Sequence, residues 1–314
     1  MPFGKYGNTE RRKYGITPRG YQSEDSLLRS LIRQREGESL GMIFDEERYI
    51  LCGDQFLSIY YGDEGTLEES FLAISINQAL GTANIDGVIE AAVTASSILI
   101  RYDPFVLGGP KLISQLKEIT RDMKRTKGKK KINSAIITLP VLYNDRWTRE
   151  CARAYGVPPN LEVIADFNGL SSIEDVIKIH SRTTYWVRYV AGPGLVGLIP
   201  FDQEIALFGP KYERPRAWTP KRTLALGGNC TSYYPFEMPG GSSLLGRLPV
   251  PLYEPTRSHP AFQENPVICN VGDRVNITSI PEEEYEEIER NIQQYEYSVK
   301  PGVFAFELQG DKGV

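Results

Sequence analysis

Short apolar runs follow one another in the second half of the chain: YWVRYVAGPG (185–194), EIALFGP (204–210), LALGGN (224–229), TSYYPFEMPGG (231–241), LGRLPVPLY (245–253) and DRVNITSI (273–280). Runs of this length, rich in β-branched and aromatic residues and ended by glycine or proline, are typical of antiparallel barrels and sandwiches. Upstream of them lie the strand-like INSAIITLPVLY and two helical stretches, Trp147–Tyr155 and Ser172–His180. We therefore expect a mainly-β barrel domain over residues 132–280.

A different pattern precedes this region. The run RYILCGDQFLSIYYGD (48–63) predicts a strand or a hairpin. The next run, TLEESFLAISINQAL (66–80), predicts a helix, with Thr66 as its N-cap, Glu69 in a near capping box and Gly81 as its end.

Two strand-like runs, IDGVIEAAVTA and SSILIRYDP, come next, and Pro110 then opens a second helix. The order strand, helix, strand, strand, helix predicts a small ferredoxin-like α+β domain over residues 48–128. The lysine-rich run KRTKGKKK (124–131) follows, and we place the domain boundary there. We interpret this run as a solvated linker or hairpin tip rather than a nucleic-acid contact, because no aromatic residues interleave it and the chain is acidic.

Composition sets the broad class. The chain has 314 residues, 41% hydrophobic and 24% charged, and 36 basic against 40 acidic residues give a formal net charge of −4. This profile is that of an ordinary globular protein. The length favours two domains, and one large domain is the alternative. Residues 1–47 are expected to form a polar N-terminal extension, with one amphipathic stretch at Ser26–Arg35, and residues 281–314 a C-terminal helix and tail. The charged N-terminus and the lack of a long apolar run predict no membrane span and a cytoplasmic location.

Histidine and cysteine usage restricts the chemistry. The four cysteines are far apart and show no ligand spacing: Cys52, Cys151, Cys230 and Cys269. The chain has two histidines, His180 and His259, and no GxSxG motif. We therefore expect no metal site and no disulfide framework, and nothing supports a catalytic triad.

One set of motifs is specific enough to resemble a known family. The set comprises Pro215-Arg216-Ala217, Thr219-Pro220, Gly227-Gly228-Asn229, the run YPFEMPGG from Tyr234 to Gly241, and Leu245-Gly246-Arg247. It is similar to the pattern PRxATPR, GGxQTxxYPxxSPGGW, xIGRTP of the 5-oxoprolinase B subunit, the kinase inhibitor KipI, allophanate hydrolase subunit 1 and half of the carboxyltransferase domain of urea carboxylase. GVIEAAVTASSILIRYDP (87–104) and His180 also match, so the resemblance covers about residues 48–280.

The resemblance implies a fold and a function. The fold would be an α+β N-terminal domain (ferredoxin-like) followed by a mainly-β cyclophilin-like barrel. The function would be that of a subunit of a multi-subunit ATP-dependent amidohydrolase or carboxylase. Its site would be composite with a companion cyclophilin-like barrel subunit of the KipA type (also called the C type). The sequence lacks a Walker A motif and an AMKM-like biotin site, so ATP would be bound mainly by another subunit, and the small-molecule substrate is not identified.

Departures from the family pattern leave alternatives open. The family's GFxPGFxYL appears only as VAGPGLVGL (190–198), the loop before Gly227 is about five residues shorter, and residues 144–169 look like an insertion. A ketone carboxylase of the acetophenone carboxylase type is therefore one variant. A regulatory binding protein of the KipI type, without catalysis of its own, is the alternative.

Candidate site residues follow from the matched motifs. His180 would transfer a proton or orient substrate, unless it only caps a helix. Arg247 and Arg216 would bind carboxylates, unless they form ion pairs. The pair Gly240-Gly241 would let backbone N–H groups approach an anion, or would only form a tight corner. Asn229 and Tyr234 would present polar groups to a ligand, or would be a turn residue and a wall.

Overall fold

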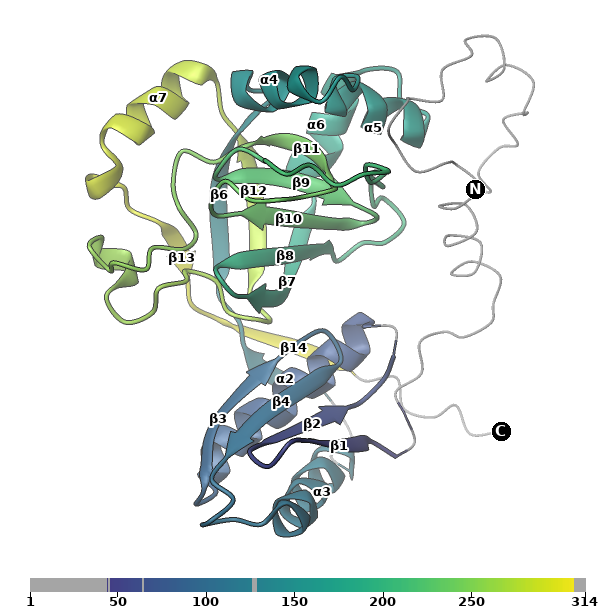
Figure 1. The fold of residues 1–314 in the computed structure, drawn as a ribbon, viewed down its shortest axis with the longest axis vertical. Coiled ribbons are helices and arrows are strands. Elements are labelled where there is room, and N and C mark those ends of the chain that lie inside the picture. The colour runs from purple at the N-terminus through teal and green to yellow at the C-terminus, as the bar shows by residue number, and fades with distance from the viewer. Residues whose placement is uncertain (1–43, 45, 64, 126–128, 308–314) are drawn as a thin grey trace, which may run out of the picture.

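The structure is a computed structural model that describes residues 44, 46–63, 65–125 and 129–307. The chain forms a small sheet-and-helix part at one end and a barrel at the other (Figure 1). None of the helices in these described ranges is long and apolar enough to cross a membrane.

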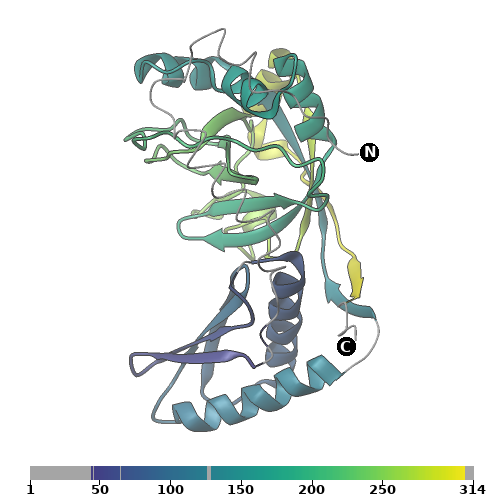
Figure 2. The same ribbon diagram turned by 90° about the vertical axis from the view of Figure 1, so that its right-hand side faces the viewer.

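The N-terminal part is a four-stranded antiparallel sheet with two helices. Its strands are β1 (Arg48–Cys52), β2 (Phe56–Tyr60), β3 (Val88–Val93) and β4 (Ser97–Tyr102), in the order β1-β2-β4-β3. Helices α2 (Leu67–Ala83) and α3 (Gly109–Arg125) lie on one side of the sheet (Figure 2). Leu57, Ile59 and Ile100 are fully buried beneath them.

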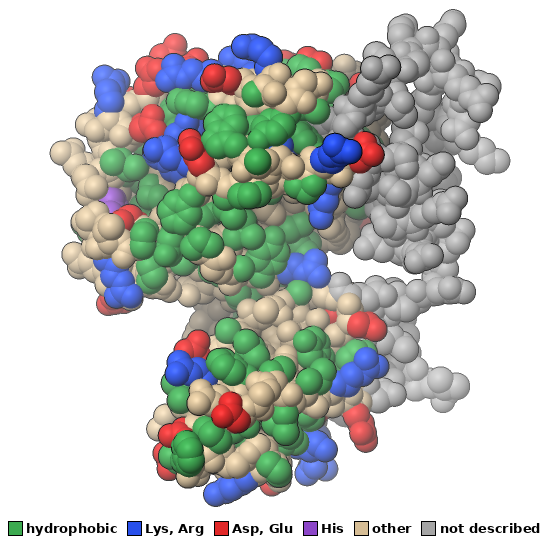
Figure 3. All heavy atoms as spheres, in the orientation of Figure 1, with side chains coloured by type: hydrophobic (Ala, Val, Ile, Leu, Met, Phe, Trp, Pro, Cys, Tyr) green, Lys and Arg blue, Asp and Glu red, His purple; other side chains and the backbone are tan. Residues whose placement is uncertain are grey.

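The ferredoxin-like arrangement is not confirmed. In that arrangement the strand after the second helix completes the sheet. Here the edge beside β2 is taken by β1, which precedes both helices, and the strand after α3 pairs elsewhere. No helix of the described residues covers the opposite face of the sheet, and hydrophobic side chains gather on this part of the molecule (Figure 3). Ile50, Phe56 and Leu99 of these strands are exposed.

Helix α2 begins as predicted and ends later. Thr66 and Glu69 form the complete capping box, because the Thr66 side chain accepts from the Glu69 N–H and the Glu69 side chain accepts from the Thr66 N–H. Gly81 does not end the helix. The helix continues to Ala83, and Asn84 closes it in the left-handed conformation with φ 45°.

The barrel confirms the predicted mainly-β half. Its strands are β6 (Ile136–Tyr143), β7 (Thr184–Ala191), β8 (Leu195–Pro200), β9 (Thr223–Gly227), β10 (Cys230–Tyr234), β11 (Ser243–Arg247) and β12 (Arg274–Ser279). They follow the order β11-β9-β10-β8-β7-β12-β6, and pairing of β11 with β6 at Leu142 and Tyr143 closes the ring. The short strand β13 (Ser298–Lys300) pairs with the first residues of β6.

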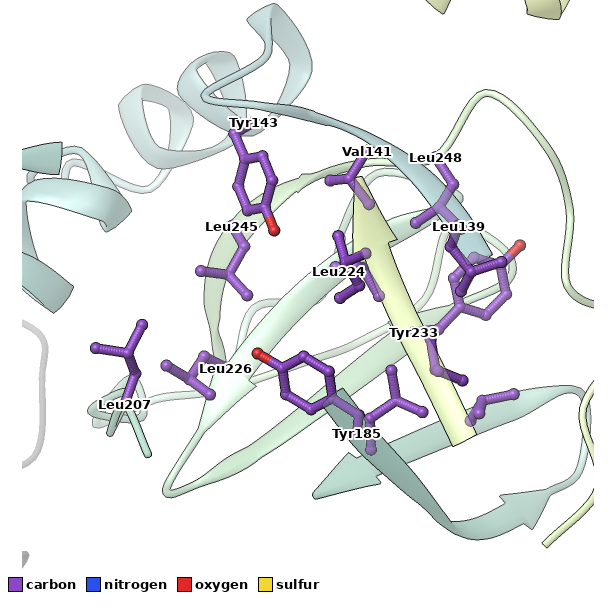
Figure 4. Packing of buried hydrophobic residues seen from close by; sticks show 14 of the residues in the cluster. Leu139, Val141, Tyr143, Tyr185, Leu207, Leu224, Leu226, Tyr233, Leu245 and Leu248 are labelled. Atoms are coloured by element: carbon purple, nitrogen blue, oxygen red, sulfur yellow. The ribbon is translucent and has the colours of Figure 1, made fainter. Parts of the chain in front are cut away.

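Alternation along the strands fills the barrel. Leu224 and Leu226 of β9 point into the interior (Figure 4), whereas Ala225 between them belongs to a cluster on the outer side. Helices α5 (Asn160–Asn168) and α6 (Ile173–Arg182) add apolar side chains to the same interior. Helix α4 (Arg146–Ala154) and α6 were predicted, and Ser172 caps α6 as expected, but α5 was not foreseen.

A ribbon of two strands joins the two parts. Strand β5 (Lys129–Asn133) leads from α3 into β6, and β14 (Val303–Glu307) returns from the barrel and pairs with β5 in antiparallel register. Lys129, Lys130 and Lys131 therefore belong to a strand, and positions 126–128 of the lysine-rich run lie outside the described residues. The tail that follows α7 (Glu282–Arg290) and the short 3-10 helix Ile292–Gln294 is thus part of the link between the two halves.

An aromatic cluster fixes this link. Trp186 of β7 is buried against Phe304 of β14, with ring centroids 5.6 Å apart, and Phe71 of α2 packs in the same cluster. The Trp186 indole N–H donates to the Ser70 hydroxyl of α2 at 3.0 Å. The barrel and the α+β part are therefore held together by packing and a buried hydrogen bond, as well as by the chain connections.

Candidate functional site

His180 lies at the end of the barrel that α6 covers. Its Nδ1 is 2.6 Å from the Tyr143 hydroxyl and its Nε2 is 2.9 Å from the Thr231 hydroxyl. The side chain is 1% exposed, and burial lowers its pKa to about 3. The ring is thus neutral at physiological pH, with both nitrogens engaged. This arrangement stabilises the barrel end, and proton transfer by His180 stays a prediction.

Asn229 lies near His180 but makes a surface contact. Its Nδ2 donates to Gln203 Oε1 at 2.8 Å. Asn229 and His180 line a cavity of about 10 Å³, which has room for about one water molecule. This small cavity is not a substrate site in the described conformation.

Arg247 lies on the opposite side of the barrel wall, under α4 and α7. Its Nη2 is 3.8 Å from Glu289 Oε1 of α7, and its guanidinium carbon is 3.9 Å from the centre of the Trp147 ring. Arg222 donates to the same Glu289 oxygen at 3.0 Å. Arg247 is 4% exposed, so its position favours the ion-pair alternative, in which two arginines hold the C-terminal helix through one carboxylate.

Arg216 occupies a different environment on the outer side of strands β9, β10 and β11. It is 1% exposed, its Nε donates to the Thr219 hydroxyl at 3.3 Å, and its guanidinium lies 4.2 Å from the centre of the Tyr212 ring. Nη1 and Nη2 have no hydrogen-bond partner among the described residues. A buried cation with unpaired donors is costly, and a carboxylate is the acceptor that matches its fork geometry.

The glycine pair forms the other wall of this cluster. Arg216 and Gly240 exchange both backbone hydrogen bonds, at 2.8 and 3.0 Å, and the Tyr212 N–H donates to the Gly241 carbonyl at 2.7 Å. Neither glycine has a positive φ. Glycine is needed at position 240 for a different reason: the Tyr234 ring packs so close to the backbone that a Cβ there would lie 2.7 Å from it. We call Arg216, Tyr212, Thr219, Tyr234 and Gly240-Gly241 the Arg216 cluster.

A cysteine borders the Arg216 cluster. Cys151 of α4 is buried, and its thiol contacts the Trp218 carbonyl at 3.7 Å. Burial raises the pKa of Cys151 to about 11, although the charge of Arg216 acts in the opposite direction. The group is therefore a protonated thiol at neutral pH and a poor nucleophile.

The predicted site residues therefore separate into three places. Arg216, Tyr234, Gly240 and Gly241 come together, while the other three lie apart: His180 with Asn229 at one barrel end, and Arg247 at the α7 contact. Sequence reasoning missed Tyr212, which has no motif of its own. Tyr212 lies four residues before Arg216 in a segment that is not helical, so its contact with the guanidinium is seen only in the structure.

Metal ligation has no support in the described part of the chain. No group of three or more His, Cys, Asp or Glu side chains there is arranged to hold a metal ion. The four cysteines are free thiols.

Comparison with known proteins places these features in a family. Residues 48–263 match the model for the carboxyltransferase domain, subdomain C and D. The chain is 28% identical over 243 residues to the 5-oxoprolinase B subunit of Bacillus subtilis, covering 74% of this chain and 92% of that protein. It is 25% identical over 273 residues to urea amidolyase of Saccharomyces cerevisiae, covering 82% of this chain but only 14% of that protein.

A solved structure supports the same fold. The Kluyveromyces lactis urea carboxylase superposes on 85% of this chain with a TM-score of 0.72 and 21% sequence identity, and the match covers 25% of that protein. The match therefore covers 14% of urea amidolyase and 25% of urea carboxylase, but 92% of the 5-oxoprolinase B subunit. Because the family model covers more than half of the chain, this protein belongs to the carboxyltransferase family defined by subdomains C and D.

Proposed function

We propose that this chain is one subunit of a multi-subunit ATP-dependent amidohydrolase or carboxylase and that it supplies a carboxylate-recognising wall of a composite site. Its family membership and its likeness to the 5-oxoprolinase B subunit support the class of enzyme. The observation that carries the role of this chain is the buried Arg216 guanidinium, which has two nitrogens without a hydrogen-bond partner among the described residues.

The described residues can bind substrate but supply no clear general base, so catalytic groups would come from another subunit. The Arg216 cluster has a cation, a tyrosine and backbone groups, but its neighbouring thiol is protonated, and His180 is neutral with both nitrogens engaged. A general base, the nucleotide site and ATP itself would then belong to another subunit. The companion barrel subunit would bury the apolar surface left by Ile50, Phe56 and Leu99, and the assembly would work in the cytoplasm.

Access to Arg216 requires a local movement. Arg216 is 1% exposed, and the neighbouring Trp218 N–H donates to the Tyr155 hydroxyl at 2.9 Å, which ties this segment to the end of α4. We therefore expect this segment to open when substrate enters, as loops do around many closed sites.

The test is affinity capture of the full-length chain, followed by assay of the captured assembly. ATP hydrolysis would be measured with 5-oxo-L-proline, urea or acetophenone as substrate. We expect substrate-dependent ATP hydrolysis by the assembly and none by the chain alone. Arg216→Leu should lower kcat/KM by about tenfold or more, because a charge-assisted contact is lost.

The control is Arg214→Leu, which removes an exposed arginine of the same segment and should leave kcat/KM unchanged. Turnover by the purified chain alone would refute the composite site. Capture of a sensor kinase without substrate-dependent ATP hydrolysis would instead support the KipI-type alternative. If Arg216→Leu and Arg214→Leu had the same kcat/KM, Arg216 would have no role in substrate binding.

A further inference from the structure

A cavity of about 500 Å³ lies where the α+β part meets the barrel. Its walls come from α2, from the link between β5 and β6, from the loop before β12, and from the link between β13 and β14. Small-molecule sites have this volume and occur preferentially at domain junctions. The cavity shares no lining residue with the Arg216 cluster.

The walls of this junction cavity are held in place. The Asp273 carboxylate accepts hydrogen bonds from the Ala135 N–H and the Asn270 N–H, both at 2.8 Å, and so joins two of the walls. The Arg274 side chain donates to Ser134 through its Nε and Nη2, each at 3.2 Å. A cavity with fixed walls loses little conformational entropy when a ligand binds.

Carboxamide side chains dominate the polar lining. They belong to Asn77 and Gln78 of α2, Asn133 of β5, and Asn270 of the loop before β12. Each carboxamide has both donors and an acceptor, although Gln78 Oε1 already accepts from the Asn133 N–H at 3.4 Å. The Asn77 Oδ1 atom is buried and has no hydrogen-bond partner in the described residues, so a small rotation of this side chain would let it accept an N–H group from a ligand.

The charge of the lining narrows the ligand class. No lysine or arginine lines the cavity in the described part of the chain, and Asp273, its one ionisable residue there, already accepts two backbone hydrogen bonds. Arg274 lies behind the lining, and its Nε and Nη2 already donate to Ser134. Phosphate and carboxylate ligands would need cations in the lining itself. Ile74, Val93 and Val271 supply an apolar surface beside the amides.

We propose that the junction cavity binds a small neutral molecule with more than one amide group, as in a capped dipeptide. The amides of such a ligand would pair with the carboxamides, its N–H group would reach Asn77 Oδ1, and its alkyl groups would lie against Ile74 and Val93. This proposal does not depend on the proposed enzyme function, because it concerns binding to the chain alone without ATP.

The test is a protein-observed NMR titration of the full-length chain with three matched probes. The probes are N-acetyl-L-alanine N-methylamide, its methyl ester analogue, which lacks one N–H donor, and N-acetyl-L-alanine, which carries a carboxylate. We expect the bis-amide to bind at least about tenfold more tightly than either analogue, a difference of about 1.4 kcal/mol. Its shifts should map to residues 74–78, 133–135 and 270–273.

Two variants locate the site. Asn77→Leu should weaken binding of the bis-amide about tenfold, and Ala135→Leu, which adds bulk to the wall, should abolish it. Gln293→Leu, an exposed carboxamide outside the cavity, is the control and should bind as the unmodified chain does. Thermal melts of all three variants establish that they are folded.

The proposal is overturned if none of the probes binds, if the acid binds as tightly as the bis-amide, or if Asn77→Leu binds normally. It is also overturned if the shifts map to another surface. Loss of this binding would not affect the ATP-dependent activity of the assembly, so the two proposals fail separately.

Discussion

Replacement of His180 by glutamine should remove an acid-labile element of the barrel. Burial lowers the pKa of His180 to about 3, whereas an unfolded histidine has a pKa near 6.5. Between these two values the unfolded chain takes up a proton that the folded chain does not, so the stability of the folded state falls as the pH falls. The free energy of unfolding changes by about 1.4 kcal/mol for each pH unit over which the unfolded chain binds one more proton than the folded chain. From pH 6.5 to pH 5 this loss amounts to about 2 kcal/mol.

Urea unfolding at pH 7.5, 6.5, 5.5 and 5.0, followed by tryptophan fluorescence, measures this effect. Trp147, Trp186 and Trp218 all lie in the barrel half, so the signal reports unfolding of that half. The unmodified chain should lose about 2 kcal/mol more than His180→Gln between pH 7.5 and 5.0. The glutamine amide can still bond Tyr143 and Thr231, which limits the loss of stability at pH 7.5.

Tyr143→Phe is the matched control. It removes the 2.6 Å contact to Nδ1 but leaves the buried imidazole, so its stability should be lower at every pH and should still fall toward acid. Parallel pH profiles for the unmodified chain and His180→Gln would refute the reasoning, because they would mean that the pKa of His180 is the same in the folded and unfolded states.

Three further substitutions test buried or partly buried side-chain interactions, each by urea unfolding. Glu289→Ala leaves two arginines without their shared carboxylate and should cost about 2 kcal/mol, with faster proteolysis of the C-terminal segment. Ser70→Ala leaves the buried Trp186 indole N–H without its acceptor and should cost about 1–2 kcal/mol. Arg216→Leu removes a buried cation with unpaired nitrogens and should raise stability by about 1 kcal/mol.

Controls accompany these substitutions. Glu287→Ala removes an exposed carboxylate of the same helix and should change stability by less than about 0.5 kcal/mol. Equal effects of Glu287→Ala and Glu289→Ala would mean that the ion pairs of Glu289 with Arg222 and Arg247 do not stabilise the fold. An unchanged unfolding midpoint in Ser70→Ala would mean that the Trp186 contact contributes nothing, and a destabilised Arg216→Leu would mean that the guanidinium is well solvated or paired.

Local sequence signals predicted much of the secondary structure. The capping box at Thr66, Pro110 near the start of α3 and the cap at Ser172 each act within one helical turn, so a short window of sequence contains them. The glycine- and proline-punctuated runs predicted the barrel half for the same reason. Helix α5 lacks a side-chain cap hydrogen bond at Pro159, and it was not foreseen.

Other features depend on contacts that local patterns do not contain. Two of these features join residues far apart in sequence: the pairing of β14 with β5 and the ion pair between Arg247 and Glu289. The position of β1 at the sheet edge is likewise a property of the whole sheet. The end of α2 is a different case, because a local cap decides it: Asn84, in the left-handed conformation, closes the helix three residues after Gly81.

The sequence by itself determined the family, the barrel half and the residue types available for chemistry, since motifs and composition are local properties. Only the tertiary structure decided that Arg216 is buried with unpaired nitrogens, that His180 is neutral with both nitrogens engaged, and that Arg247 serves a helix contact. It alone also placed the carboxamides around one cavity. Burial and pairing arise when distant segments pack together, and the same arginine or histidine has a different role in each environment.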